Sequence, residues 1–241
     1  MTAPISLAGL HDDAAFLSLE HQLHLSDVLG QHEWRVDLDA PSFSVTGDHP
    51  LTCTAVHLLG SAAPGPRSWL WSWANPSGFA PAATGLAEWL RSFGQQHGIA
   101  ELTTAELPFA DLPGTPDNPA GAAWALVNAA KAATGRWTCY TPDAGDGTYL
   151  AFLIEHPDFV LPPPETPRLL RVLQEGLFQG ITNHRRAVQS YAVGRGLDIT
   201  WTEGSAVLGA PGQSLNIDFD GLGRVNEITG TLAPSDLSRG R

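Results

Sequence analysis

The sequence predicts an α+β protein in which antiparallel sheets pack with helices in two lobes. Short, turn-rich loops join four consecutive predicted strands, which favours antiparallel pairing. A proline-rich segment at 160–167 divides the chain, and each part runs helix first and antiparallel strands after. The composition is that of a globular protein, because 43% of the residues are hydrophobic and only 16% are charged.

The first part opens with a predicted helix at residues 8–29, which ends at Gly30. Its apolar face is indicated by residues that recur at alternating spacings of four and three: Leu10, Ala14, Leu17, His21, His24 and Val28. Four strands are predicted after it, at 34–38, 42–45, 51–59 and 68–74. Because their connections are short, we expect these strands to form one antiparallel meander.

Two helices and a hairpin complete the first part. Thr84 is the predicted N-cap of the first helix, which ends between Gly94 and Gly98. Its apolar stripe consists of Leu86, Trp89, Leu90 and Phe93. Pro119 is predicted to open the second helix, which runs to Gly135. Residues 136–155 contain an Asp-Gly turn signal between two strand patterns, which predicts a hairpin.

The predicted domains are 1–160, which carries a tryptophan-rich strand, and a smaller lobe at 165–241. The smaller lobe is expected to hold two helices followed by an antiparallel sheet. The helices are placed at 168–178 and 184–195, and the strands at 198–202, 206–208, 214–218 and 224–231. The tail from Pro234 is expected to be frayed.

The formal net charge of −12 argues against nucleic acids and anionic membranes as partners. The same charge suits a basic protein partner. No stretch approaches the roughly 18 apolar residues of a membrane helix, and the N-terminal residues lack a signal-peptide pattern. We therefore expect a cytoplasmic protein.

Neither a metal nor a cofactor is predicted. Cys53 and Cys139 have no zinc-ligand spacing and are expected to be buried free thiols. His21 and His24 lie one helical turn apart, which suits a metal pair, but no third and fourth ligands are identifiable. Buried, hydrogen-bonded neutral histidines are therefore the favoured interpretation. The residues after Asp218 do not continue a calcium loop, so that interpretation is rejected.

The sequence also lacks the common catalytic signatures. It contains no glycine-rich phosphate loop, no Gly-x-Ser-x-Gly elbow and no His-Glu-x-x-His motif. The cluster of His184, Arg185 and Arg186 at a predicted helix start suits an anionic group, although solvated helix charges are the simpler interpretation. The catalytic residues are therefore unknown, and the sequence leaves open whether the protein is an enzyme.

The tryptophan row is the most conspicuous feature of the chain. Trp69, Trp71 and Trp73 alternate along one predicted strand, so their side chains are expected on one face. Such a row forms either a core ridge, which is favoured, or the wall of a pocket that stacks a flat ligand. Asn75 follows at the strand end, as a turn residue or as a polar group at the pocket mouth. These four residues are the predicted ligand-binding set.

Three segments carry a resemblance to a known family. They are His57-Leu58-Leu59-Gly60-Ser61, then Trp69-Leu70-Trp71-Ser72-Trp73-Ala74-Asn75-Pro76-Ser77, and Leu90-Arg91-x-Phe93-Gly94. In these segments the chain resembles an uncharacterised bacterial family of domains of unknown function, over roughly its first 155 residues. Because that family has no established activity, the resemblance implies no catalytic residues.

Three functional hypotheses follow. The leading one is a non-enzymatic protein that binds a small molecule or a protein partner through the lobe with the tryptophan strand. The second is an acidic immunity or regulatory protein that binds a basic partner. The third is a hydrolase whose histidine and carboxylate site is assembled only in three dimensions.

Overall fold

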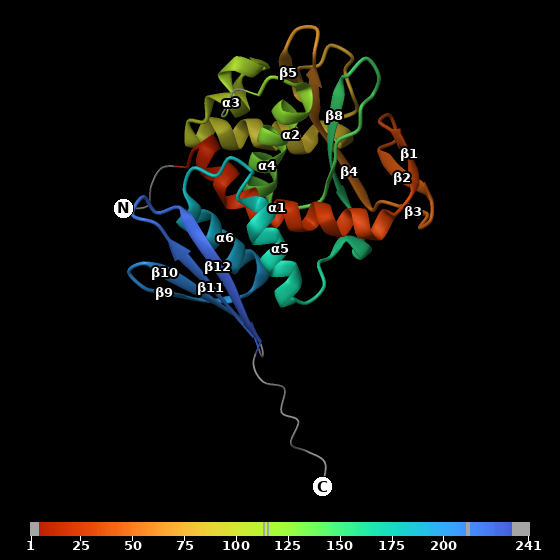
Figure 1. The fold of residues 1–241 in the computed structure, drawn as a ribbon. Coiled ribbons are helices and arrows are strands. Elements are labelled where there is room, and N and C mark those ends of the chain that lie inside the picture. The colour runs from red at the N-terminus through yellow and green to blue at the C-terminus, as the bar shows by residue number, and fades with distance from the viewer. Residues whose placement is uncertain (1–4, 113, 115, 211–212, 233–241) are drawn as a thin grey trace. The chain divides into compact units, whose positions relative to one another are not determined.

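Helices and three antiparallel sheets make up the described part of the chain (Figure 1). The computed structural model describes residues 5–112, 114, 116–210 and 213–232. The expected α+β class, with antiparallel sheets packed with helices, is thus confirmed. The expected tail from Pro234 lies outside the described residues.

The chain divides into two compact units. The first consists of Met1–His11 and Glu20–Leu161, and the second of Asp12–Leu19 and Pro162–Arg241. The sequence therefore passes from one unit to the other near the proline-rich segment. The second unit also includes eight residues of the first helix, Asp12–Leu19. The sequence-based prediction places these residues in the first part. Independent domains at 1–160 and 165–241 stay a prediction.

The first unit holds the ends of helix α1 (Leu7–Leu29) and eleven further helices and strands. They are β1 (His32–Asp37), β2 (Ser42–Gly47), β3 (Leu51–Thr52), β4 (Ala55–Ala63), β5 (Ser68–Trp71), α2 (Pro81–His97), α3 (Ala100–Thr103), β6 (Glu106–Pro108), α4 (Pro119–Thr134), β7 (Cys139–Tyr140) and β8 (Tyr149–Glu155). Short 3-10 turns occupy Ser72–Ala74, Phe109–Asp111 and Pro157–Phe159.

Side-chain capping fixes the starts of some helices, whereas α2, α3 and α5 begin without it. Asn118 caps α4 by accepting a hydrogen bond from the Gly121 amide, and Gly135 ends the helix with a φ of 67° that glycine adopts without strain. The prediction that Thr84 caps the preceding helix is wrong, because α2 begins three residues earlier. Pro81 occupies its first turn, where the missing N–H costs no hydrogen bond, and Ala80 at the N-cap position provides no side-chain cap.

The predicted four-stranded meander is also wrong. The described strands of the first unit form a three-stranded sheet in the order β1-β2-β3 and a five-stranded sheet in the order β6-β5-β4-β8-β7. The third predicted strand, at 51–59, is divided into β3 and β4, which belong to different sheets. The Cys53 amide donates to the Phe43 carbonyl on β2, whereas the Thr54 amide donates to the Glu155 carbonyl on β8. The chain thus changes sheets within one residue.

Apolar clusters cover both faces of the five-stranded sheet. Along β8, Ala151 and Leu153 lie in the cluster shared with α2 and α4, whereas Phe152 and Ile154 lie in the cluster shared with the three-stranded sheet. This alternation is the two-residue period of a strand buried on both faces. Helices α2 and α4 lie along one side of this sheet in Figure 1 and contact β4.

Both cysteines are buried free thiols, as predicted. Burial raises the pKa of the Cys53 thiol to about 12, because the charged thiolate loses its hydration there. The Cys139 thiol donates a hydrogen bond to the Gln22 side-chain oxygen at 3.3 Å. Both thiols are therefore packed or hydrogen bonded as structural residues.

The second unit packs two helices with an antiparallel sheet in the order β12-β11-β10-β9. Its elements are α5 (Thr166–Gly176), α6 (His184–Arg195), β9 (Asp198–Trp201), β10 (Ser205–Ala210), β11 (Gln213–Phe219) and β12 (Val225–Leu232). Helix α5 contacts β11 and β12, and α6 contacts β9. The predicted order of two helices and four strands is confirmed.

Within the second unit, polar contacts join the middle of α1 to the start of α6. The Asp12 carboxylate accepts hydrogen bonds from the Thr182 amide, the Thr182 hydroxyl and the Asn183 amide. The Asp13 carboxylate accepts from the Arg186 Nε at 2.7 Å and from the Ser190 hydroxyl at 2.6 Å. These contacts hold the start of α6 against α1.

Candidate ligand site beside helix α2

Trp69 and Trp71 are core residues. Neither has any exposed side-chain surface, and their rings meet edge to face with centroids 5.3 Å apart. The Trp71 indole N–H donates to the Glu101 carbonyl oxygen at 3.0 Å. Two of the four predicted ligand-binding residues therefore lie where no ligand reaches them.

Trp73 departs from the row. The prediction that it shares the strand with Trp69 and Trp71 is wrong, because β5 ends at Trp71 and a 3-10 turn follows. Ser72 causes the break, since its hydroxyl donates to the Leu58 carbonyl at 2.7 Å and its own carbonyl accepts from the Asn75 amide. Trp73 is half-buried, with the Arg91 guanidinium 4.3 Å from its ring centroid.

A pocket of about 270 Å³ lies on one flank of α2 and includes Trp73 and Asn75. Its lining residues are Ser72, Trp73, Asn75, Gly78, Phe79, Pro81, Thr84, Gly85 and Glu88. The Asn75 side-chain oxygen accepts from the Ser77 amide at 2.9 Å, which is the turn role considered for it. Trp73 and Asn75 thus stay together at a hollow, without Trp69 and Trp71.

A larger pocket of about 580 Å³ lies on the other flank of α2. It is bounded by α2, by the C-terminal end of α4 and by His57 of β4. Its lining residues are His57, Pro81, Ala82, Gly85, Leu86, Trp89, Ala133, Thr134 and Arg136. A mostly apolar wall with few polar groups is the usual composition of a small-molecule site.

The polar part of the wall includes His57 and Arg136, and both contact Glu155, which is not a lining residue. The Arg136 Nε donates to the Glu155 carboxylate at 2.6 Å, and the His57 Nε2 lies 3.4 Å from the same oxygen. The pKa of His57 is lowered, chiefly by burial and then by the Arg136 charge, against the opposing effect of Glu155. His57 is therefore a neutral imidazole at neutral pH.

The lowered pKa of His57 predicts a loss of stability in acid. The unfolded chain binds the proton more tightly, so the free energy of unfolding is greatest above about pH 6.5 and falls as the pH drops toward the folded pKa. Below that folded pKa it levels off. Urea denaturation at pH 7.5 and 5.5 measures the difference. His57→Gln is expected to reduce this difference in the free energy of unfolding. His184, whose pKa is also lowered by burial, contributes to the difference in the same direction.

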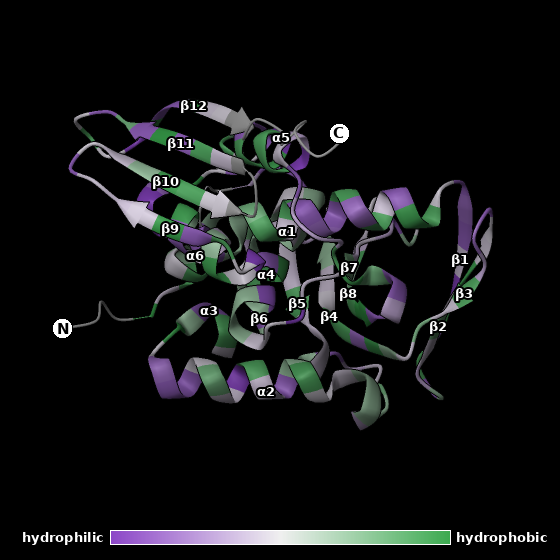
Figure 2. Ribbon diagram, turned by 90° about the horizontal axis from the view of Figure 1, so that it is seen from below, coloured by the Kyte–Doolittle hydropathy of each residue, from purple (hydrophilic) through white to green (hydrophobic). Residues whose placement is uncertain are grey.

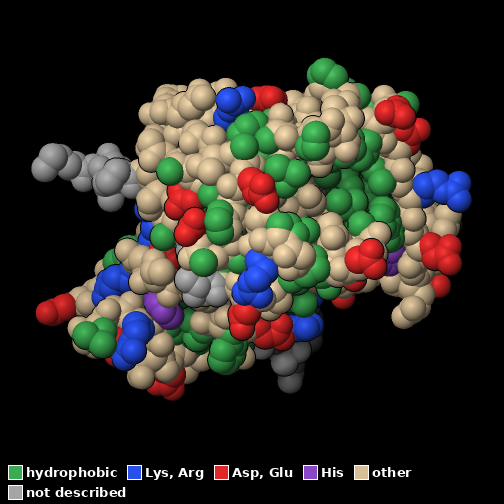
Figure 3. Space-filling model, turned by 90° about the horizontal axis from the view of Figure 1, so that it is seen from above, with side chains coloured by type: hydrophobic (Ala, Val, Ile, Leu, Met, Phe, Trp, Pro, Cys, Tyr) green, Lys and Arg blue, Asp and Glu red, His purple; other side chains and the backbone are tan. Residues whose placement is uncertain are grey.

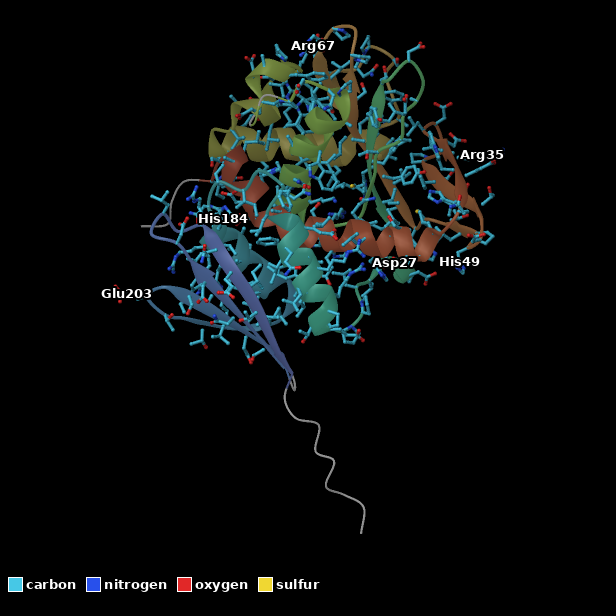
Figure 4. The ribbon with its side chains drawn as sticks, viewed as in Figure 1. Asp27, Arg35, His49, Arg67, His184 and Glu203 are labelled. Carbon is cyan, nitrogen blue, oxygen red and sulfur yellow. The ribbon has the colours of Figure 1, made fainter. Side chains whose placement is uncertain are left out.

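The matched control for this measurement is His49→Gln, because His49 is exposed in the loop between β2 and β3 (Figure 4). It is expected to leave the pH difference unchanged. An equal loss of stability in acid for wild type and His57→Gln would contradict the prediction.

The N-terminus of α2 adds positive potential to the same wall. Pro81 and Ala82 line the larger pocket in the first turn of α2, which has no side-chain cap. Pro81 has no N–H, and the amides of Ala83 and Thr84 donate to the Ala80 carbonyl, so the contribution here is the partial positive charge of the helix dipole. Together with Arg136, this end of the pocket favours a negatively charged group.

The apolar part of the wall comes from the outer residues of α2. Trp89 is 47% exposed, and its ring stacks with Phe93 at a centroid distance of 5.4 Å. Leu86 lies one turn earlier and also lines the pocket. In Figure 2, α2 carries hydrophobic and hydrophilic bands along its length. Trp89 offers a flat surface for a ring.

The other predicted site residues are used in local contacts. The His24 Nε2 lies 3.1 Å from the Asp158 carbonyl oxygen, and the His21 ring stacks with Trp137. Among the described residues, no group of three or more His, Cys, Asp or Glu side chains is placed to hold a metal ion.

The basic cluster at the start of α6 is likewise occupied. Arg186 pairs with Asp13, and Arg185 donates to the Glu203 carbonyl and lies over the rings of Trp201 and Phe219. The His184 Nδ1 accepts from the Val225 amide. These contacts stabilise the second unit.

Asp220 closes the β11–β12 turn. Its carboxylate accepts from the amides of Leu222 and Arg224 and from the Arg224 guanidinium. These hydrogen bonds lower the pKa of Asp220, because they favour the charged carboxylate. Asp220 is thus a turn residue.

An open apolar area lies elsewhere in the first unit. Half-buried side chains of β1 and its surroundings pack on the cluster below the three-stranded sheet: Trp34, Val36, Leu38, Leu51, Tyr140 and Leu150. Figure 3 shows hydrophobic side chains gathered on its right side, where β1–β3 lie in Figure 1. The larger pocket differs from this area in that Arg136 lies among its apolar lining residues.

Residues 8–157 match the model of a family that is described as a family of unknown function, DUF6882. This range is more than half of the chain. The chain therefore belongs to the DUF6882 family. Membership confirms the expected resemblance to a family of unknown function. No curated protein and no solved structure matches the chain.

Both pockets lie inside the part of the chain that matches DUF6882. Their lining residues run from His57 to Arg136, within residues 8–157. The candidate site is thus a feature of the DUF6882 part, whereas β9–β12 follow it in the chain. No helix among the described residues has the length and hydrophobicity needed to cross a membrane.

Sequence reasoning missed most of the larger pocket. In the sequence, His57 stands out only within a segment that carries the family resemblance, and Leu86 and Trp89 only as members of an apolar stripe. The pairing of Arg136 with Glu155 could not be predicted from the sequence. Arg136 follows α4 and Glu155 ends β8, and only the tertiary structure brings the two side chains together. Trp89 was the one clue in the sequence. Its neighbours on that side of the helix, Ala82, Gly85 and Glu88, add little apolar surface, which indicates that the Trp89 ring is exposed.

Proposed function

We propose that this member of the DUF6882 family is a non-enzymatic binding protein for a small molecule with an anionic head and a flat apolar body. The ligand occupies the larger pocket beside α2. The observation that carries the proposal is the placement of Arg136 and neutral His57 on an otherwise largely apolar wall that includes Trp89.

Arg136 supplies the contact for the head. Its Nε is bonded to Glu155, while its two Nη groups have no hydrogen-bond partner among the described residues. A guanidinium binds carboxylates and related anions through paired N–H groups. His57 adds a neutral donor or acceptor beside it. Because Glu155 already balances one charge and the whole chain carries −12, a single negative charge on the ligand fits better than several.

The absence of an activated nucleophile in the wall favours binding over hydrolysis. Thr134 is the one hydroxyl among the described lining residues, and its Oγ1 donates to the Ala130 carbonyl at 2.7 Å. The hydrolase alternative would use His57 as a base with Glu155 behind it, but that carboxylate is already bonded to Arg136. The alternative of a basic protein partner is supported by the net charge, with acidic side chains spread over the face in Figure 3.

The proposal includes a cytoplasmic location. Two cysteines remain as free thiols, which is the usual state of cysteines in a reducing compartment.

The test uses three fluorinated probes that share one ring: 4-fluorobenzoate, 4-fluorobenzamide and 4-fluorobenzylamine. Binding to the full chain is followed by fluorine NMR titration. We expect 4-fluorobenzoate to bind more tightly than the amine by at least about fivefold, which corresponds to about 1 kcal/mol. Arg136→Gln is expected to remove that preference, and Trp89→Ala is expected to weaken all three probes.

Two variants serve as controls. Arg35→Gln removes an exposed arginine of β1 that points away from the helices (Figure 4), and Phe178→Ala removes an exposed aromatic ring of the second unit. Neither is expected to change the binding of any probe. If 4-fluorobenzoate does not bind, or binds Arg136→Gln as well as wild type, the proposal is wrong.

A further inference from the structure

Two buried donors beside the smaller pocket lack hydrogen-bond partners among the described residues. They are the indole Nε1 of Trp73 and the guanidinium Nε of Arg91. The two groups are neighbours, because Arg91 lies over the Trp73 ring. A buried donor without a partner costs about 1–3 kcal/mol, so such groups in a native protein point to an acceptor that satisfies them.

The smaller pocket is the space next to these donors, and because the Trp73 Nε1 has almost no accessible surface, an acceptor in the pocket reaches it only after a shift of the Trp73 or Arg91 side chain. Trp73 lines it, together with Asn75, Thr84 and Glu88. The Asn75 side-chain oxygen is occupied by the Ser77 amide, which leaves its amide nitrogen as a donor. The Glu88 carboxylate lies 3.7 Å from the Arg91 guanidinium, so the two charges beside this pocket offset each other. The pocket therefore favours a neutral oxygen acceptor such as a carbonyl, an amide or a hydroxyl group.

The two pockets meet over the outer face of α2. Pro81 and Gly85 line both of them, and they lie four positions apart on one helix face. A Cβ at Gly85 would meet nothing within 4 Å, so the helix surface is open and low at this point. A ligand that crosses α2 at Gly85 contacts both flanks.

We infer that the smaller pocket is a second subsite of the same ligand site and that the ligand passes over α2 at Gly85. This inference rests on the proposed function. The ligand class is an elongated molecule with an anionic, ring-bearing end at Trp89 and Arg136 and a neutral oxygen acceptor at Trp73. Since a helix with side chains is about 10 Å across, the two ends lie roughly 10 Å apart.

The first test concerns the acceptor subsite alone. Benzamide is the probe, and its binding is measured by NMR titration in a Trp89→Ala background, in which the larger pocket no longer offers its indole ring to the probe. Trp73→Phe keeps the aromatic ring and removes the donor, and it is expected to weaken benzamide at least fivefold. Arg35→Gln is the control and is expected to leave benzamide binding in that background unchanged. Unchanged affinity of Trp73→Phe for benzamide would show that the pocket holds only water and would overturn the inference.

The second test concerns the passage at Gly85. The probe is one molecule that joins benzoate to benzamide through a flexible chain of about 10 Å. We expect it to bind wild type at least tenfold more tightly than 4-fluorobenzoate, because the second end binds intramolecularly. Gly85→Leu is expected to remove this gain by blocking the crossing. Gly85→Ala, which adds one methyl group to open space, is the matched control and is expected to keep most of it.

The two proposals fail in different ways. If 4-fluorobenzoate binds through Arg136 but the joined molecule gains nothing, the second subsite is wrong and the proposed function stands. The same conclusion follows if Gly85→Leu keeps the full gain. If 4-fluorobenzoate itself does not bind wild type, the proposed function fails.

Discussion

Replacing Gly60 with alanine is expected to lower the free energy of unfolding by about 3 kcal/mol or more. A Cβ built at Gly60 would lie 2.4 Å from the Leu70 carbonyl oxygen and 2.6 Å from the Trp69 Cζ2 atom. Gly60 lies in the central strand β4, where it pairs with Trp71 on one side and Ala151 on the other. Because neighbours on both sides fix this backbone, the added methyl group is accommodated only by disrupting the sheet and the Trp69 ring.

Urea denaturation followed by circular dichroism measures this effect. The matched control is Gly65→Ala, because a Cβ at Gly65 in the loop between β4 and β5 would meet nothing within 4 Å. Its stability is expected to stay within about 1 kcal/mol of wild type. A Gly60→Ala protein as stable as Gly65→Ala would show that β4 and Trp69 do not pack as described.

Removal of the Trp71 side chain is the second large effect. Trp71→Ala is expected to lower the free energy of unfolding by about 3–5 kcal/mol, because a fully buried indole leaves a cavity that its surroundings do not fill. The substitution also removes the indole hydrogen bond to the Glu101 carbonyl and so leaves a buried acceptor without its partner. The same denaturation experiment measures the loss.

Two phenylalanine variants separate packing from hydrogen bonding. Trp71→Phe keeps an aromatic ring and loses the donor, so it is expected to cost less than Trp71→Ala but at least about 1 kcal/mol. Trp73→Phe removes a donor that has no described partner and is expected to leave stability nearly unchanged without ligand. Equal losses for these two phenylalanine variants would contradict the different roles assigned to Trp71 and Trp73.

Local chemistry was enough to predict most helices and turns. Gly30, Gly135 and Gly196 end helices as expected, because each adopts a positive φ that other residues reach only with strain. In the second unit, the turn at Asp220 joins β11 and β12, which are neighbouring strands in the chain and in the sheet. In these places a few consecutive residues contain the whole signal.

Local sequence did not predict which strands pair with each other or which side chains meet. Nothing in the pattern of residues 51–59 shows that the Cys53 amide bonds to β2 and the Thr54 amide to β8. The departure of Trp73 from the tryptophan row likewise depends on the Leu58 carbonyl, which accepts from Ser72. The site has the same origin, because His57, Arg136 and Glu155 meet only through sheet pairing and the end of α4.

The eight residues Asp12–Leu19 limit how this chain can be divided by recombination. A gene exchange at the proline-rich segment would transfer α5, α6 and β9–β12 without the α1 residues that belong to their unit. Thr182 and Arg186 would then lose the carboxylates of Asp12 and Asp13. The match to DUF6882, residues 8–157, ends before those partners and yet contains the two aspartates. The two units are therefore expected to be inherited together, and a fragment that begins at Pro162 is expected to fold poorly.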